Sequence, residues 1–122
     1  MLTYEKACKG HEHDESSTAF CFYAYEDGVK VGEAYVLVDD DHDDAMVDWI
    51  EIYGENKGRG LGTEFLLHLA SANEYGEIVM APNSEDAQRL YERLGEDASE
   101  RKHDRWVEQW QYIDQGFGVY RI

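Results

Sequence analysis

The chain has 122 residues, with 27 acidic and 11 basic side chains, a formal net charge of −16 and a pI near 4.4. This length supports one core, so we expect a single domain over residues 1–122. The acidic surface disfavours direct contact with nucleic acid phosphates and favours cationic amines or basic proteins as partners. No apolar run reaches the ~20 residues that span a bilayer, and no signal peptide is visible, so we expect a cytoplasmic protein without membrane contact.

The first half of the chain predicts an antiparallel meander of strands. A first strand is expected over 1–8, followed by a polar loop or single helical turn over 9–18. A β-prone run covers 19–25, and Asp27-Gly28 predicts a tight hairpin into a partner strand over 29–38, with Gly32 a plausible bulge. An acidic connection over 39–44 leads to the next strand, 45–53. In an apparently intracellular chain, Cys8 and Cys21 are expected to be thiols rather than a disulfide.

The second half predicts two helices separated by a short strand. The apolar spacing of residues 61–69 predicts a helix over about 60–72, and 77–81 reads as a buried strand. Ser84 is expected to cap a second helix, which Gly95 ends. For 99–116 the aromatic spacing favours a helix over a strand, and 117–122 reads as a final strand.

The run Lys57-Gly58-Arg59-Gly60-Leu61-Gly62-Thr63 lies between a predicted strand and a predicted helix. Such a turn exposes backbone N–H groups beside the positive end of the helix dipole, which is an arrangement that binds phosphate. The lysine precedes the glycines, unlike in a Walker A loop. The glycines also follow an antiparallel meander rather than the first strand of a βαβ series, which disfavours a dinucleotide-binding fold.

These residues resemble the signature of the GCN5-related N-acetyltransferase (GNAT) superfamily, Arg/Gln-x-x-Gly-x-Gly/Ala, with Lys57 in place of Arg or Gln. A second family pattern, Ala-x-x-Leu-Tyr-Glu-x-Leu-Gly, is matched by Ala87 to Gly95. The resemblance covers about residues 29–95. The family usually has two helices between its first two strands, where this chain has only about ten polar residues, so the chain resembles a small, reduced member.

The resemblance implies an α/β (α+β) fold with a mixed, mostly antiparallel sheet. The sheet would splay between its fourth and fifth strands and be flanked by two or three helices. It implies acetyl-CoA as the cofactor, with the pyrophosphate on the N–H groups of 58–63, the Thr63 hydroxyl as a further donor, and the pantetheine arm between the splayed strands. The cofactor-binding residues would be Ile50, Ile52, Lys57, Gly58, Arg59, Gly60, Leu61, Gly62, Thr63 and Ser84.

Catalytic roles follow from the same resemblance and from strand alternation. The N–H near Ile52 would polarise the thioester carbonyl. Tyr91 occupies the place of the acid that protonates the departing thiolate, although it could equally be a core tyrosine. Glu51 is the first candidate base and Asp48 the second, and strict alternation puts Asp48 on the face of Ile50 and opposite Glu51. Taken singly, each of these carboxylates could be an ordinary surface residue.

No metal site is expected, because His11-x-His13-Asp14 and the acidic run 39–44 read as solvated loops.

The implied reaction is acetyl transfer from acetyl-CoA to a primary amine by direct attack. The acceptor would be a small cationic amine such as a polyamine, or a lysine or N-terminus of a basic protein. The alternative is a non-catalytic acidic interaction or inhibitor protein on a degenerate acetyltransferase fold. A soluble acidic surface, a halophilic source and phosphate mimicry each account for the charge, and a monomer or homodimer is expected.

Overall fold

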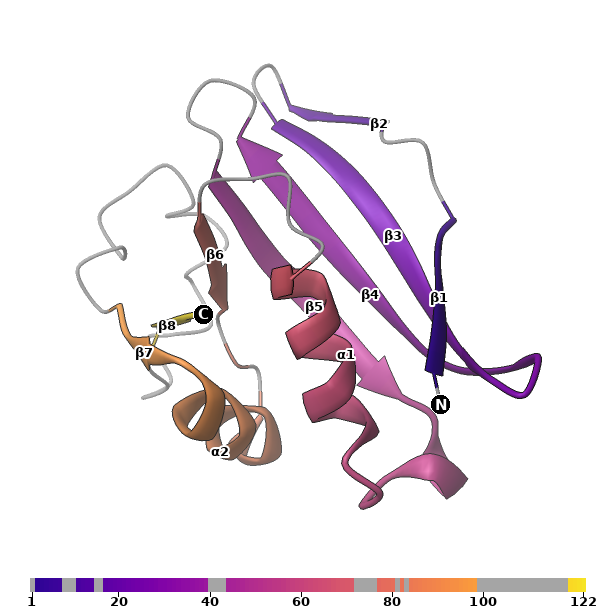
Figure 1. Cartoon of the computed structure of the whole chain (residues 1–122). Coiled ribbons are helices and arrows are strands. Elements are labelled where there is room, and N and C mark those ends of the chain that lie inside the picture. The colour runs from indigo at the N-terminus through magenta and orange to yellow at the C-terminus, as the bar shows by residue number, and fades with distance from the viewer. Residues whose placement is uncertain are drawn as a thin grey trace.

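The computed structural model describes residues 2–7, 11–14, 17–39, 44–71, 77–80, 82, 84–98 and 119–122 (Figure 1). The elements, in chain order, are β1 (Leu2–Lys6), β2 (His11–Asp14), β3 (Ser17–Glu26), β4 (Val29–Asp39), β5 (Asp44–Ile52), η1 (Gly54–Asn56), α1 (Leu61–Ser71), β6 (Glu77–Met80), α2 (Glu85–Leu94), β7 (Glu96–Asp97) and β8 (Tyr120–Arg121). Among these, no helix is long and apolar enough to cross a membrane. The predicted helix over 99–116 lies outside the described residues.

The strands form one mixed sheet in the order β1-β3-β4-β5-β6-β8-β7, with β2 also paired to β3. Every pair is antiparallel except β5 and β6, which run parallel. The mixed, mostly antiparallel sheet with two flanking helices confirms the fold class expected from the sequence.

The hairpin between β3 and β4 forms as its turn residues predict. Glu26 pairs with Val29, and the two residues between them have positive φ angles of 52° at Asp27 and 81° at Gly28. Two such angles define the hairpin turn whose twist matches the flanking strands.

The expected loop over 9–18 is wrong for His11–Asp14, which form β2. The reason lies in the length of β3. Strand β1 pairs only with residues 22–26 of this ten-residue strand, so its first half would leave an open edge. Strand β2 pairs with that half and satisfies its backbone groups, even though its own sequence is polar.

Gly32 is required by a close approach between strands rather than by a bulge at its own position. The register of β3 against β4 shifts by one residue at Val31, immediately before it. A Cβ atom on Gly32 would lie 2.7 Å from the carbonyl oxygen of Glu51. Only glycine therefore lets β4 lie this close to β5.

The sheet splays between β5 and β6. Their parallel pairing ends at Val47 and Met80, and the rest of β5 continues to Ile52 with no partner on that side among the described residues. A register shift between β4 and β5 leaves Asp48 as an extra residue, which is a β-bulge. This bulge resets the alternation, so Val47 and Ile50 pack in the same core cluster although they are three residues apart.

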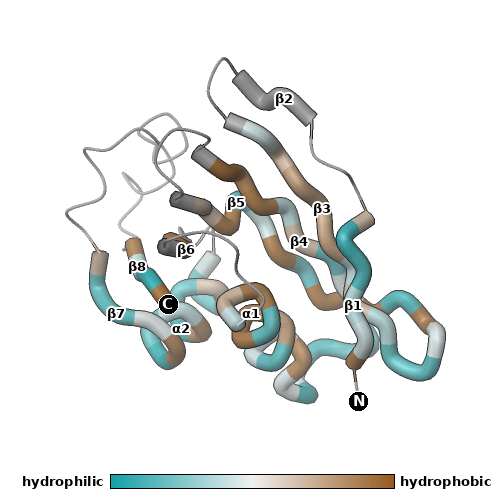
Figure 2. The backbone as a smooth tube through the Cα atoms, turned by 45° about the horizontal axis from the view of Figure 1, so that its top comes forward, coloured by the Kyte–Doolittle hydropathy of each residue, from teal (hydrophilic) through white to brown (hydrophobic). Residues whose placement is uncertain are grey.

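Both helices cover the same face of the sheet, and the main core lies between them and β4, β5 and β6 (Figures 1 and 2). Phe65 and Leu66 of α1 are fully buried there, as are Val47 of β5 and Met80 of β6. In Figure 2, hydrophobic segments run along β3, β4 and β5 beside α1. The helical spacing that predicts α1 therefore corresponds to the face that the sheet buries.

The opposite face of the sheet carries aromatic side chains. Tyr35 of β4 stacks on Trp49 of β5 with ring centroids 5.3 Å apart, and the ammonium of Lys30 lies 3.5 Å from the ring centroid of Tyr23.

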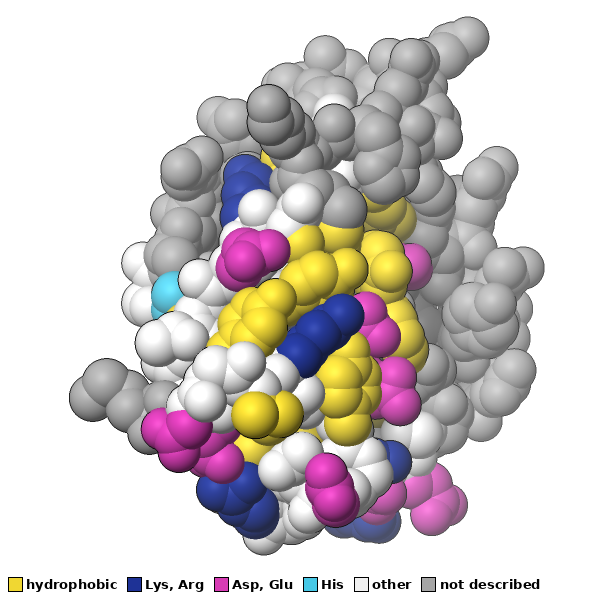
Figure 3. Space-filling view, turned by 90° about the vertical axis from the view of Figure 1, so that its right-hand side faces the viewer, with side chains coloured by type: hydrophobic (Ala, Val, Ile, Leu, Met, Phe, Trp, Pro, Cys, Tyr) yellow, Lys and Arg dark blue, Asp and Glu magenta, His cyan; other side chains and the backbone are white. Residues whose placement is uncertain are grey.

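Figure 3 shows the side of the molecule at β1, β3 and the β3–β4 hairpin. Hydrophobic side chains surround a basic one there, and acidic side chains lie among them rather than in one continuous patch.

The expectation that Cys21 is a free thiol is wrong, because Cys21 is disulfide-bonded. The sequence argument used the cellular compartment and ignored geometry. Strand pairing brings the end of β1 beside this cysteine, since the N–H of Ala7 donates to the carbonyl of Cys21 at 2.9 Å. Cys8 lies outside the described residues.

Candidate active site

The turn that joins η1 to α1 is built on two glycines with positive φ, 82° at Gly58 and 77° at Gly60. Side chains other than glycine rarely adopt these angles, which explains why both positions are glycine. The first helical hydrogen bond runs from the N–H of Glu64 to the carbonyl of Gly60 at 3.1 Å. The N–H groups of residues 61–63 come before it and have no carbonyl partner within α1. They point out of the positive end of the helix dipole, where an anion is stabilised.

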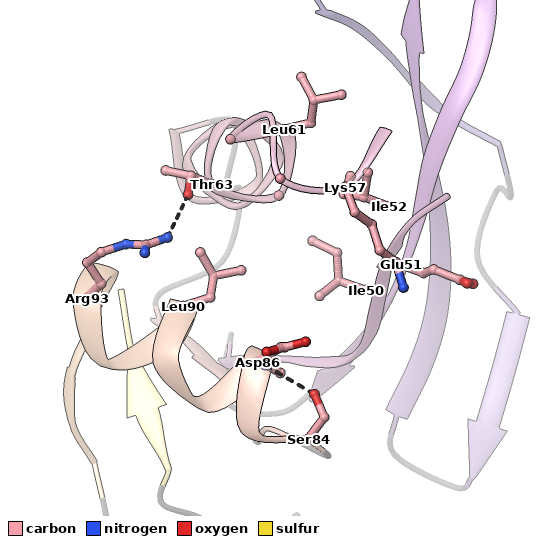
Figure 4. A pocket seen from close by; sticks show the side chains of 14 residues that line it. Ile50, Glu51, Ile52, Lys57, Leu61, Thr63, Ser84, Asp86, Leu90 and Arg93 are labelled. Atoms are coloured by element: carbon pink, nitrogen blue, oxygen red, sulfur yellow. Dashed lines mark hydrogen bonds between the residues drawn. The ribbon is translucent and has the colours of Figure 1, made fainter. Parts of the chain in front are cut away.

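This turn forms one wall of a cavity of about 490 Å³. The end of β5 forms a second wall and one side of α2 forms the third (Figure 4). The cavity is lined by Ile50, Glu51, Ile52, Lys57, Gly58, Gly60, Leu61, Gly62, Thr63, Ser84, Asp86, Ala87, Leu90 and Arg93. It therefore begins at the glycine turn and continues to where β5 and β6 have separated.

Nine of the ten cofactor-binding residues expected from the sequence line this cavity, and the exception is Arg59. The Arg59 guanidinium donates to the Glu26 carboxylate at 2.8 Å and to the Asn56 amide oxygen at 3.0 Å. The hydrogen bond from Arg59 lowers the pKa of Glu26, and the same bond raises the pKa of Arg59. The side chain of Arg59 thus ties the turn to the β3–β4 hairpin.

Ser84 has the capping role that its position predicts. Its side-chain oxygen accepts from the N–H of Ala87 at 3.1 Å at the start of α2. A hydroxyl that accepts one hydrogen bond keeps its own proton as a donor, so Ser84 can also donate into the cavity it lines.

The three candidate catalytic residues have different positions. Tyr91 is only 2% exposed, packs in the main core and is not among the cavity-lining residues, and burial raises the pKa of its phenol. Glu51 is among the lining residues, but its carboxylate points away from the cavity toward the other face of the sheet (Figure 4). Asp48 is an exposed residue outside the cavity lining. The alternation that placed it with Ile50 fails because of the bulge.

Four lining residues on α2 were not expected from the sequence as site residues, namely Asp86, Ala87, Leu90 and Arg93. Ala87 and Leu90 lie on the apolar side of α2, which packs against the core and also faces the cavity. The guanidinium of Arg93 donates to the Thr63 hydroxyl oxygen at 3.4 Å, which connects α2 to the first turn of α1 (Figure 4). The helical spacing of 86, 90 and 93 was the signal that could have identified this wall.

The positive-φ turn at a helix N-terminus, beside a cavity bordered by the unpaired end of β5, is an arrangement in an α/β protein that suits a phosphate-bearing ligand. The acetyltransferase (GNAT) family profile matches residues 2–95, which is most of the chain. The chain therefore belongs to the GNAT family of acetyltransferases.

Solved structures share this fold. A GNAT family acetyltransferase from Elizabethkingia anophelis with acetyl-CoA bound has a TM-score of 0.64 at 13% identity, covering 99% of this chain and 97% of that one. N-acetylglutamate synthase from Neisseria gonorrhoeae, complexed with coenzyme A and L-arginine, has a TM-score of 0.67 at 13% identity, covering 98% of this chain. An acetyltransferase from Thermus thermophilus has a TM-score of 0.57 at 16% identity, covering 89%.

The chain spans 32% of the length of the synthase and 64% of the Thermus enzyme. Among curated proteins, no relative matches. Identities this low establish a shared fold and say nothing of a shared substrate.

Proposed function

We propose that this acetyltransferase uses acetyl-CoA as the donor and transfers the acetyl group to a primary amine by direct attack. The observation that carries the proposal is the cavity itself, which joins a glycine turn with outward N–H groups to the opening between β5 and β6. A phosphate-bearing head and a long thin arm are the two parts of CoA that such a cavity fits. Neighbours of the same fold have acetyl-CoA or coenzyme A bound, which supports this donor.

The cavity walls suit the two parts of this donor. The glycine turn supplies the N–H groups of 61–63, and Lys57 adds a positive side chain to the cavity lining. Further along, Ile50, Ile52 and Leu90 offer an apolar lining for the pantetheine arm. The thioester would then lie beyond Val47, where β5 has separated from β6.

The backbone of β5 supports an oxyanion-stabilising role for the N–H of Ile52. The N–H of the next residue, Tyr53, donates to the carbonyl of Val31 at 2.9 Å and so points toward β4. N–H groups of successive strand residues point to opposite sides, so that of Ile52 points to the side from which β6 has separated. A donor aimed at a developing oxyanion stabilises the tetrahedral intermediate that forms when the amine nitrogen attacks the carbonyl carbon.

Two proton transfers complete the reaction. The attacking amine must lose a proton to a base or a water chain, and the thiolate that leaves when the C–S bond breaks must gain one. The Tyr91 phenol is protonated at neutral pH, which is the state that an acid requires, and burial raises its pKa further. Glu51 lies at the cavity rim with its carboxylate on the other face of the sheet, so it would serve an amine that approaches from that face.

The acceptor proposed here is a cationic amine, either a polyamine or a lysine or N-terminus of a basic protein segment. The net charge of −16 supports this choice, because an acidic surface concentrates cationic ligands near the site.

The test is thiol release from acetyl-CoA with spermidine, a lysine-rich peptide and a peptide with a free N-terminus, against a reaction without amine. We expect turnover with at least one amine. We expect Tyr91→Phe to lower kcat by about 100-fold at unchanged acetyl-CoA affinity, since general acid catalysis contributes roughly 10²–10⁴-fold. We also expect Glu51→Gln to lower kcat if Glu51 is the base, and Glu55→Gln, which changes an exposed acid outside the cavity lining, is its matched control. Absence of turnover with every amine would overturn the transfer reaction and favour a purely interacting protein.

A further inference from the structure

Arg93 connects the two helices that border the cavity. It is an exposed residue in the last turn of α2, and its guanidinium donates to the Thr63 hydroxyl oxygen at 3.4 Å (Figure 4). Thr63 is in the first turn of α1, whose N–H groups have no partner within the helix. Arg93 therefore brings a positive charge from a distant segment to the anion-binding end of α1.

Two basic and two acidic residues line the cavity. Of its four charged lining residues, Lys57 adjoins the glycine turn and Arg93 faces the first turn of α1. Asp86 is in the first turn of α2, seven residues before Arg93 and so about two helical turns away, and it forms an ion pair with Arg89. The carboxylate of Glu51 points away from the cavity (Figure 4). Arg93 is therefore the basic side chain that lies at the start of α1, in a protein whose net charge is −16.

The contact between Arg93 and Thr63 leaves the hydroxyl group of Thr63 able to donate a hydrogen bond. The Thr63 oxygen accepts from Arg93, so the hydroxyl proton remains free to donate to another acceptor. A phosphate oxygen at the start of α1 would receive this proton, the turn N–H groups and a guanidinium N–H together. Arginine suits this role because its planar fork retains several N–H donors after one is used.

We propose that Arg93 is a binding residue for the pyrophosphate of the acyl donor, and that it acts together with Thr63 and the N–H groups at the start of α1. It thereby selects donors that carry a pyrophosphate. This assignment rests on the proposed function, since it takes a CoA thioester as the donor.

The test is calorimetric titration of CoA and of dephospho-CoA, which lacks the 3′-phosphate but keeps the pyrophosphate. We expect Arg93→Gln to weaken both ligands about tenfold, the lower range for a hydrogen bond to a charged group because the side chain is exposed. Arg89→Gln is the matched control, because it removes the same charge from the same helix at an exposed residue outside the cavity lining. We expect its affinities to stay within about twofold of wild type.

The outcomes separate the two claims. If the wild-type protein binds CoA and Arg93→Gln binds both ligands equally well, the assignment of Arg93 is wrong while the proposed donor stands. A loss with CoA alone would place Arg93 at the 3′-phosphate and would also overturn the pyrophosphate assignment. If the wild-type protein binds neither ligand, the proposed function fails and the assignment falls with it. Unfolding of Arg93→Gln without ligand should match wild type, which shows that any loss of affinity is local.

Discussion

Replacing Gly60 with alanine tests whether the conformation of the glycine turn matters for the site. The φ angle at Gly60 is 77°, and a Cβ atom there would meet no heavy atom within 4 Å. The substitution therefore introduces no clash, and its whole effect is backbone strain. A left-handed conformation costs a residue with a Cβ about 1–2 kcal/mol. If the alanine variant keeps the turn conformation, the strain lowers the free energy of unfolding. If the turn relaxes instead, its N–H groups lose their orientation.

The assay is denaturant unfolding of Gly60→Ala with and without CoA, together with calorimetry. We expect the free energy of unfolding to fall by about 1 kcal/mol if the turn persists, or the CoA affinity to fall about tenfold if it relaxes. Gly54→Ala is the control, because its Cβ also meets open space and its φ is not positive. We expect it to change neither quantity appreciably. A Gly60→Ala protein with wild-type stability and wild-type CoA affinity would refute the reasoning.

Three further predictions concern the core, the pH dependence and a close contact. Phe65→Ala empties a fully buried site and should lower the unfolding free energy by about 3–5 kcal/mol; a loss below about 1 kcal/mol would contradict the core assignment. His68 stacks on Tyr4 with ring centroids 3.6 Å apart, and burial lowers the pKa of its imidazole. The neutral imidazole therefore contributes its full share of the folding stability above the ordinary pKa of 6.5, and this contribution is lost as the pH falls below that value. His68→Phe should flatten the decrease in melting temperature between about pH 7.5 and 5.5, and an unchanged slope would exclude this cause. Gly95→Ala places a Cβ 2.7 Å from the Arg121 carbonyl oxygen and should cost about 1–3 kcal/mol in chemical unfolding, whereas a neutral result would show that β8 can shift freely.

The elements predicted best were those whose signals are local. The Asp27-Gly28 turn, the apolar stripe of α1 and the Ser84 cap each act within a few residues, and all three are present. The family resemblance added the splay of the sheet, which local patterns could not indicate.

The errors arise from interactions between distant segments. Strand β2 exists because β3 is longer than its partner β1, and its polar sequence gives no sign of this. The bulge at Asp48 depends on the register against β4, so strict alternation misplaced that side chain. The end of α2 at Gly95 was predicted correctly, but its φ is −118°, and the glycine is explained by the nearby Arg121 carbonyl, which the sequence does not reveal.

The same contrast between local and long-range signals holds for the candidate site. The glycine-turn residues that line the cavity could be proposed from the sequence because they are contiguous. The role of Arg59 could not, since Glu26, which holds its side chain, is 33 residues away. Arg93 lies 30 residues after Thr63, and only the packing of α2 against the cavity brings them together. Contacts between side chains that are distant in the sequence can be found only from the structure.

The most direct test of the central claim is calorimetric titration of the wild-type protein with acetyl-CoA. The account predicts one saturable site per chain, and thermal unfolding in excess ligand should show stabilisation of about 2.7 kcal/mol at a concentration of about 100 Kd. Gly62→Ala should weaken this binding without loss of stability, because its Cβ would contact Leu90 at 3.5 Å and Ile52 at 3.7 Å inside the cavity. Absence of both binding heat and thermal stabilisation at millimolar acetyl-CoA would contradict the account.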